Sequence, residues 1–343
     1  MPHQDLDPHA RPPEQIKSLY KRYQKLKGDA LFKDVDLLDL QRDHPSLVRI
    51  GEVSVHEQER TFKAFSRGRE EAVPKTSGHP LPIYAHEAMP GLRIVPGLLP
   101  PEIQLELISR LVHRDVSDPT HQSNIHLHYD MEYPPNNASF FSIQSPDAFL
   151  IPPKDASVHK SLNVSQLLTK KLRWITLGGQ YDWTNKVYPD DIPPAFPSDI
   201  SQLLRGLFPE IVPEAAIVNF YSPGDTLSLH RDVAEDCNRG LISISIGCDG
   251  IFILGLDDEK KSEVSDSDSA KSSSILAIRL RSGDAVYMDG ESRFAWHGVP
   301  QIVPNTCPDS LRNWPAVDGR YEYWRGWMAN KRINLNVRQM WDG

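Results

Sequence analysis

The sequence predicts an α+β protein whose second half is an antiparallel sandwich or barrel of the jelly-roll type. After residue 214, short segments rich in β-branched and aromatic residues follow one another without a helical pattern between them, and Gly, Asp or Ser bounds each one. The 29 prolines among the 343 residues favour loops and short strands over long helices. The strand-like segments are AAIVNFY (215–221), LISISIG (241–247), GIFILGL (250–256), SILAIRL (274–280), DAVYMDG (284–290) and YEYWRGWM (321–328).

Helical spacing is found earlier in the chain. Between residues 13 and 27, the apolar residues Ile16, Leu19, Tyr20 and Tyr23 recur at i, i+3, i+4 and i+7, which predicts a helix. This helix also carries five basic residues, and two interpretations stay open, a nucleic-acid contact or a solvated face. Further helices are expected from Pro101 and over 161–171 and 198–207.

Three segments follow from these patterns. Residues 1–89 are expected to form an N-terminal helical and linker extension, in which the polar stretch 52–84 is a linker or an excursion. Residues 90–213 are expected to form a helix-rich support and substrate-recognition lid. Residues 214–343 are expected to form the jelly-roll core, and the acidic, serine-rich stretch 257–274 inserts into it as a mobile loop.

Composition limits the class of protein. With 39% hydrophobic residues, the chain can bury a substantial core, which excludes a wholly disordered, collagenous or coiled-coil protein. The formal net charge of −8 argues against non-specific nucleic-acid binding. Half of that charge lies in residues 257–268, which hold six acids and two lysines, so acids and bases nearly balance elsewhere. A local basic groove is therefore compatible with the composition.

Cysteine usage and the first residues suggest a compartment. The three cysteines are scattered without a CxxC pair, which argues against a disulfide framework and a structural zinc site. The first residues lack the apolar core of a signal peptide, and no apolar run approaches the ~18 residues of a membrane span. We expect an intracellular monomer with no membrane partner, in the nucleus or cytoplasm, with the mitochondrion left open.

The segment His230-Arg231-Asp232 is the first candidate for chemistry. Side chains two apart on an extended chain face the same way, so this imidazole and carboxylate could meet one ion. A third ligand is offered by His297 in FAWHGVP. Two His and one carboxylate are the facial triad of non-haem Fe(II) oxygenases. An H-x-D pair alone is equally compatible with a surface ion pair or a structural histidine.

The segment 332–338, RINLNVR, strengthens that interpretation. Its polar residues are all at even positions and its apolar residues all at odd positions, which predicts a strand with one packed face and one polar face. Arg332 and Arg338 would suit a dicarboxylate, because guanidinium groups bind carboxylates through two parallel hydrogen bonds. Asn219 and Tyr221 repeat the pattern on an earlier strand. A solvated edge strand is the alternative.

These motifs together resemble a known family. NFYSPGDTLSLHRD, the later WHG and the terminal RINLNVR resemble the AlkB family of Fe(II)/2-oxoglutarate dioxygenases. KLRWITLGGQYDW, YPDDIPPAFPSDI and RINLNVRQM are similar to the branch that contains eukaryotic AlkB homologue 1. The resemblance covers roughly residues 90–343 and is tightest from 172 onward. It implies a double-stranded β-helix core with N-terminal helical elaborations and a nucleotide-recognition lid.

The resemblance also implies roles for individual residues. By matching motif, the iron ligands would be His230, Asp232 and His297. Arg332, helped by Tyr221, would bind the far carboxylate of 2-oxoglutarate. The residues near its metal-chelating end would be Asn219, Asn334 and Arg338. The implied reaction consumes O2 and 2-oxoglutarate, yields succinate and CO2, and removes an N-methyl group from a nucleobase as formaldehyde.

Substrate recognition is implied less directly. A base must leave its stack to reach the metal, and aromatic faces receive it. Trp174, Tyr181 and Trp183 are the candidates, and hydrophobic packing under a lid is the alternative for the tryptophans. In several relatives an acidic residue two positions after the iron-binding Asp selects the base; here that position is Ala234, and the neighbouring Glu235 is the candidate substitute.

The favoured partner is nucleic acid, RNA such as tRNA before DNA. The alternatives are a protein or peptide hydroxylase or histone demethylase on the same metal core, and a jelly-roll binding module without catalysis. A basic rim around the pocket would favour a phosphate-bearing substrate, and a neutral or acidic rim a peptide.

Overall fold

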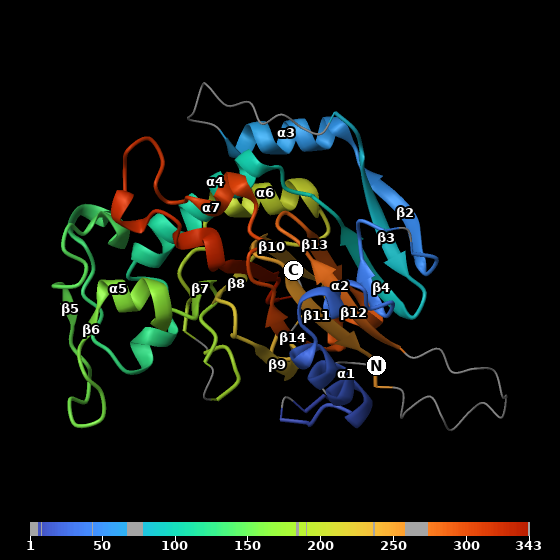
Figure 1. Ribbon diagram of the computed structural model, residues 1–343, viewed down its shortest axis with the longest axis horizontal. Helices are drawn as coiled ribbons and strands as arrows, with labels where there is room; N and C mark the ends of the chain where they lie inside the picture. Colours follow the sequence, from blue (N-terminus) through green and yellow to red (C-terminus); the bar gives the residue numbers. More distant parts are fainter. Residues whose placement is uncertain are drawn as a thin grey trace.

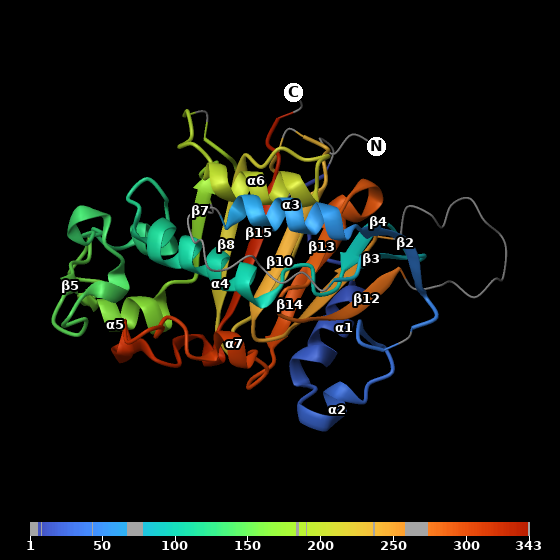
Figure 2. The ribbon, with the colours of Figure 1, turned by 90° about the horizontal axis from the view of Figure 1, so that it is seen from above.

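The computed structural model shows two β-sheets that face each other, with helices on the outside (Figures 1 and 2). The residues that the structure describes are 6–7, 9–42, 44–66, 78–182, 185–189, 191–235, 237–257 and 274–341. The expected insertion at 257–274 therefore lies almost wholly outside the described residues.

The larger sheet has eight strands in the order β2-β3-β4-β13-β10-β15-β8-β7. Its central strand β15 (Arg332–Arg338) pairs antiparallel with β10 (Leu241–Gly247) on one side and β8 (Ala215–Tyr221) on the other. Strand β13 (Ala285–Met288) pairs with the other side of β10, and β7 (Trp174–Gly178) forms one edge of the sheet. All seven residues of β15 are buried, so its polar face is directed into the protein and not toward solvent.

The smaller sheet has five strands in the order β1-β12-β11-β14-β9. In chain order these strands are β1 (Leu37–Asp39), β9 (Leu227–His230), β11 (Gly250–Gly255), β12 (Ile275–Leu280) and β14 (Trp296–Ile302). Antiparallel pairing dominates both sheets, and among the described strands only the short β1 pairs in parallel. The expected α+β class with a jelly-roll core is confirmed.

The expectation of a linker at 52–84 is wrong for its described parts, residues 52–66 and 78–84. This stretch contains α3 (Val55–Phe65) and lies between β2 (Leu47–Val53) and β4 (Met89–Val95), with β3 (Leu81–His86) at its end. A capping box begins α3, and the helix packs on α6 (Ser198–Leu207). A polar composition concealed these elements, because one buried face of a helix or strand needs few apolar residues.

The expectation of a strand at 321–328 is also wrong. The segment forms the short 3₁₀ turns Glu322–Trp324 and Trp327–Asn330. Tyr321 and Gly326 have φ of 57° and 83°, which an extended strand cannot accommodate. The indoles of Trp324 and Trp327 are buried, so aromatic content indicated packing and not strand geometry.

The first expected helix is confirmed as α1 (Glu14–Lys25), which buries Ile16, Tyr20 and Tyr23 against β11 and β14. The short α2 (Gly28–Phe32) follows, and α4 begins at the expected Pro101. The helix expected at 161–171 is α5 (Val164–Gln166), continued by a π-helical turn. The remaining elements are α4 (Pro101–Ser109), β5 (Leu150–Ile151), β6 (Leu162–Asn163) and α7 (Asp309–Arg312).

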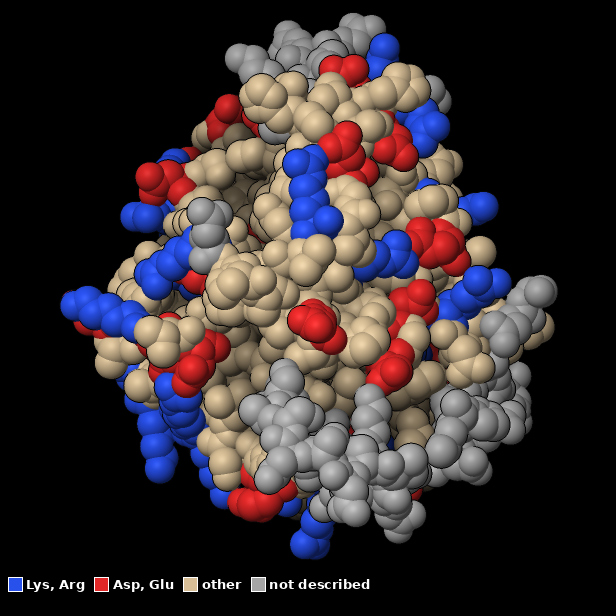
Figure 3. All heavy atoms as spheres, turned by 90° about the vertical axis from the view of Figure 1, so that its right-hand side faces the viewer, with Lys and Arg blue, Asp and Glu red and all other residues tan. Residues whose placement is uncertain are grey.

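Residues 114–173 form a lobe of short turns beside β7, at the left of Figures 1 and 2. On the opposite side of the molecule, acidic and basic side chains are interspersed (Figure 3). No helix within the described residues combines the length and apolar character that crossing a bilayer requires. The division of the chain at residues 89 and 213 stays a prediction.

Candidate metal centre

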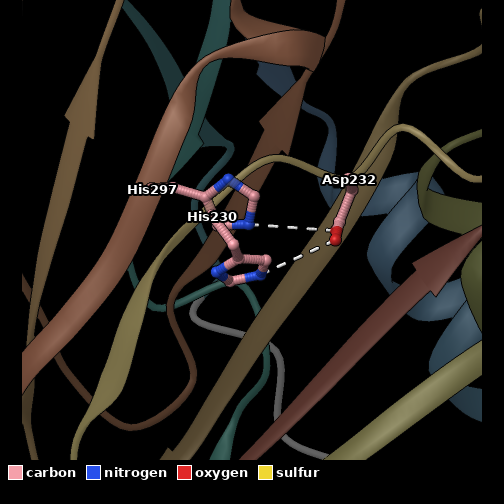
Figure 4. A group of neighbouring side chains, drawn as sticks. All are labelled: His230, Asp232 and His297. Carbon is pink, nitrogen blue, oxygen red and sulfur yellow. Dashed lines mark ion pairs between the residues drawn. The ribbon is translucent and has the colours of Figure 1, made fainter. Parts of the chain in front are cut away.

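The neighbouring residues His230 and Asp232 and the sequence-distant His297 converge between the two sheets (Figure 4). His230 ends β9, His297 lies opposite it on β14, and Asp232 follows two residues after β9. The His230 Nε2–Asp232 Oδ1 distance is 3.6 Å and the His297 Nε2–Asp232 Oδ2 distance is 3.8 Å. One donor atom from each residue lies within 4.8 Å of the others, so the three could hold one metal ion.

The backbone sets the tautomer of both imidazoles. His230 Nδ1 lies 2.9 Å from the Ser228 carbonyl oxygen, and His297 Nδ1 lies 3.1 Å from that of Ala295. A carbonyl only accepts, so each Nδ1 carries the proton and each Nε2 keeps a free lone pair. His297 Nε2 is buried and has no hydrogen-bond partner among the described residues. Burial, with a contribution from His230, lowers the pKa of His297 to about 4, so this ring is neutral near pH 7.

Asp232 is held ionised. Burial alone would raise the pKa of its carboxyl group, but the Arg338 guanidinium, followed by the two imidazoles, lowers that pKa well below its usual range. Arg338 Nη2 donates to Asp232 Oδ2 at 2.5 Å. The donor set therefore consists of two imidazole nitrogen atoms and one carboxylate, which fits a divalent ion such as Fe(II).

A buried ion network supports Asp232. Arg293 is 1% exposed and donates through Nη1 to the main-chain oxygen of Asp232 at 2.7 Å. Its Nη2 lies 2.9 Å from Glu235 Oε2, and Glu235 Oε1 lies 3.1 Å from Arg338 Nε. Tyr188 donates to the same Oε1 at 3.3 Å and accepts from Arg338 Nη1 at 3.2 Å. Two guanidinium groups thus enclose the Glu235 carboxylate directly behind Asp232.

Sequence analysis missed Arg293 and Tyr188. Arg293 precedes the WHG motif by three residues, and Tyr188 begins the quoted YPDDIPP segment. Neither position has a local pattern that distinguishes it from an exposed Arg or Tyr. A ring of charged groups from three segments and a tyrosine hydroxyl from a fourth becomes visible only when the chain is folded.

A second group of buried polar atoms surrounds Arg332. In the register of β15 and β8, Arg332 lies opposite Tyr221. Arg332 Nη2 donates to Ser245 Oγ at 2.8 Å. Arg332 Nε and Nη1, and the Tyr221 hydroxyl, are buried with no hydrogen-bond partner among the described residues. Burial raises the pKa of Tyr221 to about 12, which keeps its hydroxyl a donor. Buried donors without acceptors are costly, so this arrangement fits an incoming carboxylate.

The two asparagines expected beside the co-substrate differ. Asn334 Nδ2 donates to Ser243 Oγ at 2.8 Å and to the Ile244 carbonyl oxygen at 3.1 Å, so its amide is used within the sheet. Asn219 lines a cavity of about 340 Å³ that opens beside the metal ligands. The cavity is also lined by Tyr181, Lys186, Asp232, Asn336 and Arg338.

Only some of the residues expected to contact the substrate line the cavity. Tyr181 lines the cavity and packs edge-on against Tyr188 at 5.2 Å between ring centroids. Glu235 also lines it, but its carboxylate is held by the two arginines. Trp174 lies at the start of β7 opposite Asn219, half-buried, and is not among the described lining residues. Trp183 lies outside the described residues.

A two-sheet jelly-roll with a His-x-Asp…His group defines a class of non-haem iron oxygenase. Residues 91–338 match the sequence profile of the 2OG-Fe(II) oxygenase superfamily. The chain belongs to this superfamily, whose cofactors are Fe(II) and 2-oxoglutarate. The resemblance to the AlkB family and its AlkB homologue 1 branch is confirmed by the relatives.

The chain matches three relatives over most of each relative's length. The chain is 44% identical to the N6-methyladenosine RNA demethylase ALKB1 of Pyricularia oryzae, over 98% of each chain. It is 53% identical to the N6-methyladenosine RNA demethylase ALKBH of Cryphonectria parasitica, over 64% of this chain and 100% of the relative. It is 39% identical to the tRNA demethylase abh1 of Schizosaccharomyces pombe, over 75% of this chain and 82% of the relative.

Proposed function

We propose that the chain is an Fe(II)- and 2-oxoglutarate-dependent dioxygenase that removes N-methyl groups from adenine in RNA and releases formaldehyde, succinate and CO2. The observation that carries the proposal is the convergence of His230, Asp232 and His297, with a buried Nε2 on His297 that lacks any partner among the described residues. The names of the relatives, which act on N6-methyladenosine in RNA or on tRNA, support the substrate class.

The residues of the metal end have separable tasks. His230, Asp232 and His297 would hold Fe(II) on one face and leave the other face open. Bound iron with 2-oxoglutarate and O2 supplies the oxidising chemistry that hydroxylates a methyl group. Arg338 keeps Asp232 ionised and oriented, and Arg293 holds the main chain of the same residue. The two Nδ1–H groups keep both imidazoles turned with Nε2 inward.

Arg332 and Tyr221 form the acid end of the site, which would bind the co-substrate. Arg332 and Tyr221 offer three buried donor groups to the far carboxylate of 2-oxoglutarate. Asn219 and Arg338 lie where the metal-chelating end of the same molecule would reach, because both line the cavity beside Asp232. Asn334, whose amide nitrogen is occupied by Ser243 and Ile244, would support β10 more than contact the ligand.

The charges of the cavity favour a phosphate-bearing substrate over a peptide. Its two described acids, Asp232 and Glu235, are both paired with guanidinium groups. The other charged lining residues beyond Arg338 are Lys186 and Arg231, which are basic. Tyr181 offers an aromatic wall to an extruded base.

A turnover panel tests the proposal. The full chain with Fe(II), 2-oxoglutarate and O2 should release formaldehyde from an RNA oligonucleotide bearing N6-methyladenosine or from tRNA bearing N1-methyladenosine. His230→Ala should abolish release, whereas His56→Ala, on an exposed residue of α3, should leave it intact. Turnover of methylated DNA alone would move the substrate from RNA to DNA. Turnover of a methylated peptide alone would overturn the nucleic-acid assignment, and failure to bind metal would overturn the dioxygenase assignment.

A further inference from the structure

A hollow on the lobe of residues 114–173 is separate from the metal cavity. It measures about 380 Å³ and lies beside the α5 region, at the left of Figure 1. Its lining residues include Tyr129, His159, Lys160, Gln166, Lys170 and Lys171. None of these lines the cavity beside the metal ligands. The hollow is large enough for about one nucleotide unit.

This hollow is basic in a chain that is acidic overall. Residues 156–181 contain Lys160, Lys170, Lys171 and Arg173 and no Asp or Glu, although the formal net charge of the chain is −8. Arg173 is paired with Asp225. Lys160, Lys170 and Lys171 are exposed, and the structure gives their ammonium groups no acceptor within the described part of the chain. Three unneutralised cations that share one hollow attract a polyanion.

Ring faces form the wall beside these cations. His159 lies 4.7 Å from His128 and 5.9 Å from Tyr129, measured between ring centroids. His128 is exposed, and Tyr129 is only partly buried. Flat rings next to ammonium groups are the combination that single-stranded nucleic acid uses, because bases stack on rings while phosphates pair with cations. An acidic peptide would use the cations alone.

The backbone that presents the lysines is anchored. Leu167 and Leu168 are each 1% exposed, so the π-helical turn Leu167–Lys171 directs its lysines outward. The Lys171 carbonyl oxygen accepts from Asn124 Nδ2 at 2.8 Å, and the Leu168 carbonyl oxygen accepts from Trp327 Nε1 at 3.0 Å. A site held this firmly loses little backbone entropy when a ligand binds.

The turn leads directly to the edge strand of the larger sheet. Lys171 precedes β7 by three residues, and the first residue of β7, Trp174, pairs with Asn219, which lines the metal cavity. The backbone that lines the hollow therefore continues into a strand that pairs with β8, which lines the cavity.

We propose that this hollow is a second contact site for the same RNA strand whose methylated base enters the metal cavity. Phosphates farther along the strand, beyond those next to the target base, pair with Lys160, Lys170 and Lys171, and one unpaired base packs against His159 and Tyr129. The inference rests on the proposed function for the identity of the strand.

Binding of unmethylated single-stranded RNA of about 12 nucleotides, followed by fluorescence anisotropy over a salt series, tests the contact. In the full chain, K160Q/K170Q/K171Q should weaken binding by about tenfold and lower the slope of log K against log salt by about 2, three contacts at ~0.7 each. The matched control K33Q/R60Q/K63Q removes the same charge from exposed residues outside the lobe and should change affinity by about twofold or less. Unchanged affinity and slope in the lobe variant would overturn the inference, as would equal weakening in the control.

The rings provide a second arm. His159→Ala should weaken RNA binding by about threefold or more, and His159→Tyr should restore it, because stacking needs the ring face. Displacement of the RNA by a polyglutamate peptide of equal charge would show a general polyanion site and overturn the RNA assignment.

A short substrate separates this inference from the proposed function. A methylated trinucleotide is too short to span both sites, so wild type and the lobe variant should demethylate it with the same kcat/KM, while the lobe variant loses kcat/KM only on long RNA. Equal loss on both lengths would overturn the second site. If wild type demethylates neither RNA but the lobe variant still loses long-RNA binding, the contact site stands and the proposed function fails.

Discussion

The two ends of the candidate site are built on strands of opposite character. The acid end stands on β15, which has hydrogen-bonded neighbours on both sides in the middle of the eight-stranded sheet. The metal end stands on β9, a four-residue strand at the edge of the five-stranded sheet, and its pairing with β14 has a register shift beside His297. A central strand is positioned by its own ladder, whereas a short edge strand needs support from elsewhere.

That support comes from residues distant in sequence. Tyr20 of α1 donates its hydroxyl to the Leu227 carbonyl oxygen at 3.0 Å, on the strand that carries His230. Arg293 holds the loop after the strand through the main-chain oxygen of Asp232. The metal end therefore depends on side-chain contacts, which a single substitution can remove. The acid end depends on the backbone hydrogen bonds of β15, which a single substitution does not remove.

The largest effect is expected from Arg293→Met. Removal of this guanidinium leaves Glu235, which is 3% exposed, with one of its two cationic partners missing. Breaking a buried ion pair in this way should lower the free energy of unfolding by about 3–5 kcal/mol, measured by urea denaturation. Arg325→Met, which breaks an exposed pair with Glu322, should leave the denaturation midpoint nearly unchanged. A loss below about 1 kcal/mol for the first variant would mean that the network does not support the loop.

The acid end should respond to pH through Asp284. Its main-chain oxygen accepts from Ser245, the residue that holds Arg332. Burial, partly offset by hydrogen bonds from two backbone N–H groups, raises the pKa of Asp284 to about 6. The folded state binds this proton more tightly than the unfolded state does. The resulting contribution to the free energy of unfolding is complete below pH ~4 and is lost as the pH rises through 6.

Asp284→Asn removes this titration. From pH 4 to pH 7 the difference in unfolding free energy should therefore move in favour of the variant, by about 3 kcal/mol at most. Denaturant curves across that range measure it, and a pH-independent difference would contradict the raised pKa.

Arg332→Lys sharpens the contrast between the two ends. A lysine keeps the positive charge but lacks the planar guanidinium group, whose parallel N–H groups bind both oxygens of a carboxylate. The KM for 2-oxoglutarate should rise by about 10- to 100-fold, while metal affinity, measured by calorimetry, stays unchanged. An equal loss of metal affinity would show that the two ends are not independent.

The smallest effect is expected from Tyr20→Phe. Loss of its hydrogen bond should reduce metal affinity by about fivefold and speed hydrogen exchange in β9, with 2-oxoglutarate affinity little changed. Tyr23→Phe is the matched control, because the buried Tyr23 hydroxyl donates to Asp34 Oδ1 at 3.4 Å and not to the strand that carries His230. Identical behaviour of the two variants would show that α1 does not support the metal end.

The sequence predicted the parts of the site that repeat with a local period. Alternation in 332–338 placed Arg332 and Arg338 on one face, and the H-x-D spacing placed His230 and Asp232 together. The FAWHGVP segment offered His297 as the third ligand, and the resemblance then supplied the cofactors. The assignment of iron and co-substrate roles to individual residues, like the intracellular location, stays a prediction.

Residues that act through distant contacts could not be found in this way. The network of Arg293, Glu235 and Tyr188 joins segments about fifty residues apart, and nothing in the local pattern marks a buried charge. Strands β2 to β4 were missed because half-buried strands with mixed polar residues show weak alternation. Arg338 was expected beside the co-substrate alone, and its pairing with Asp232 followed from neither motif nor period.

The position of β15 in the chain has a consequence for biogenesis. This strand is later in sequence than either of its neighbours, β8 and β10, yet it lies between them. During synthesis those two strands must wait with open backbone edges until residues 332–338 leave the ribosome. The larger sheet therefore closes late, and a chaperone that shields unpaired edges would assist the nascent polypeptide more than the finished one.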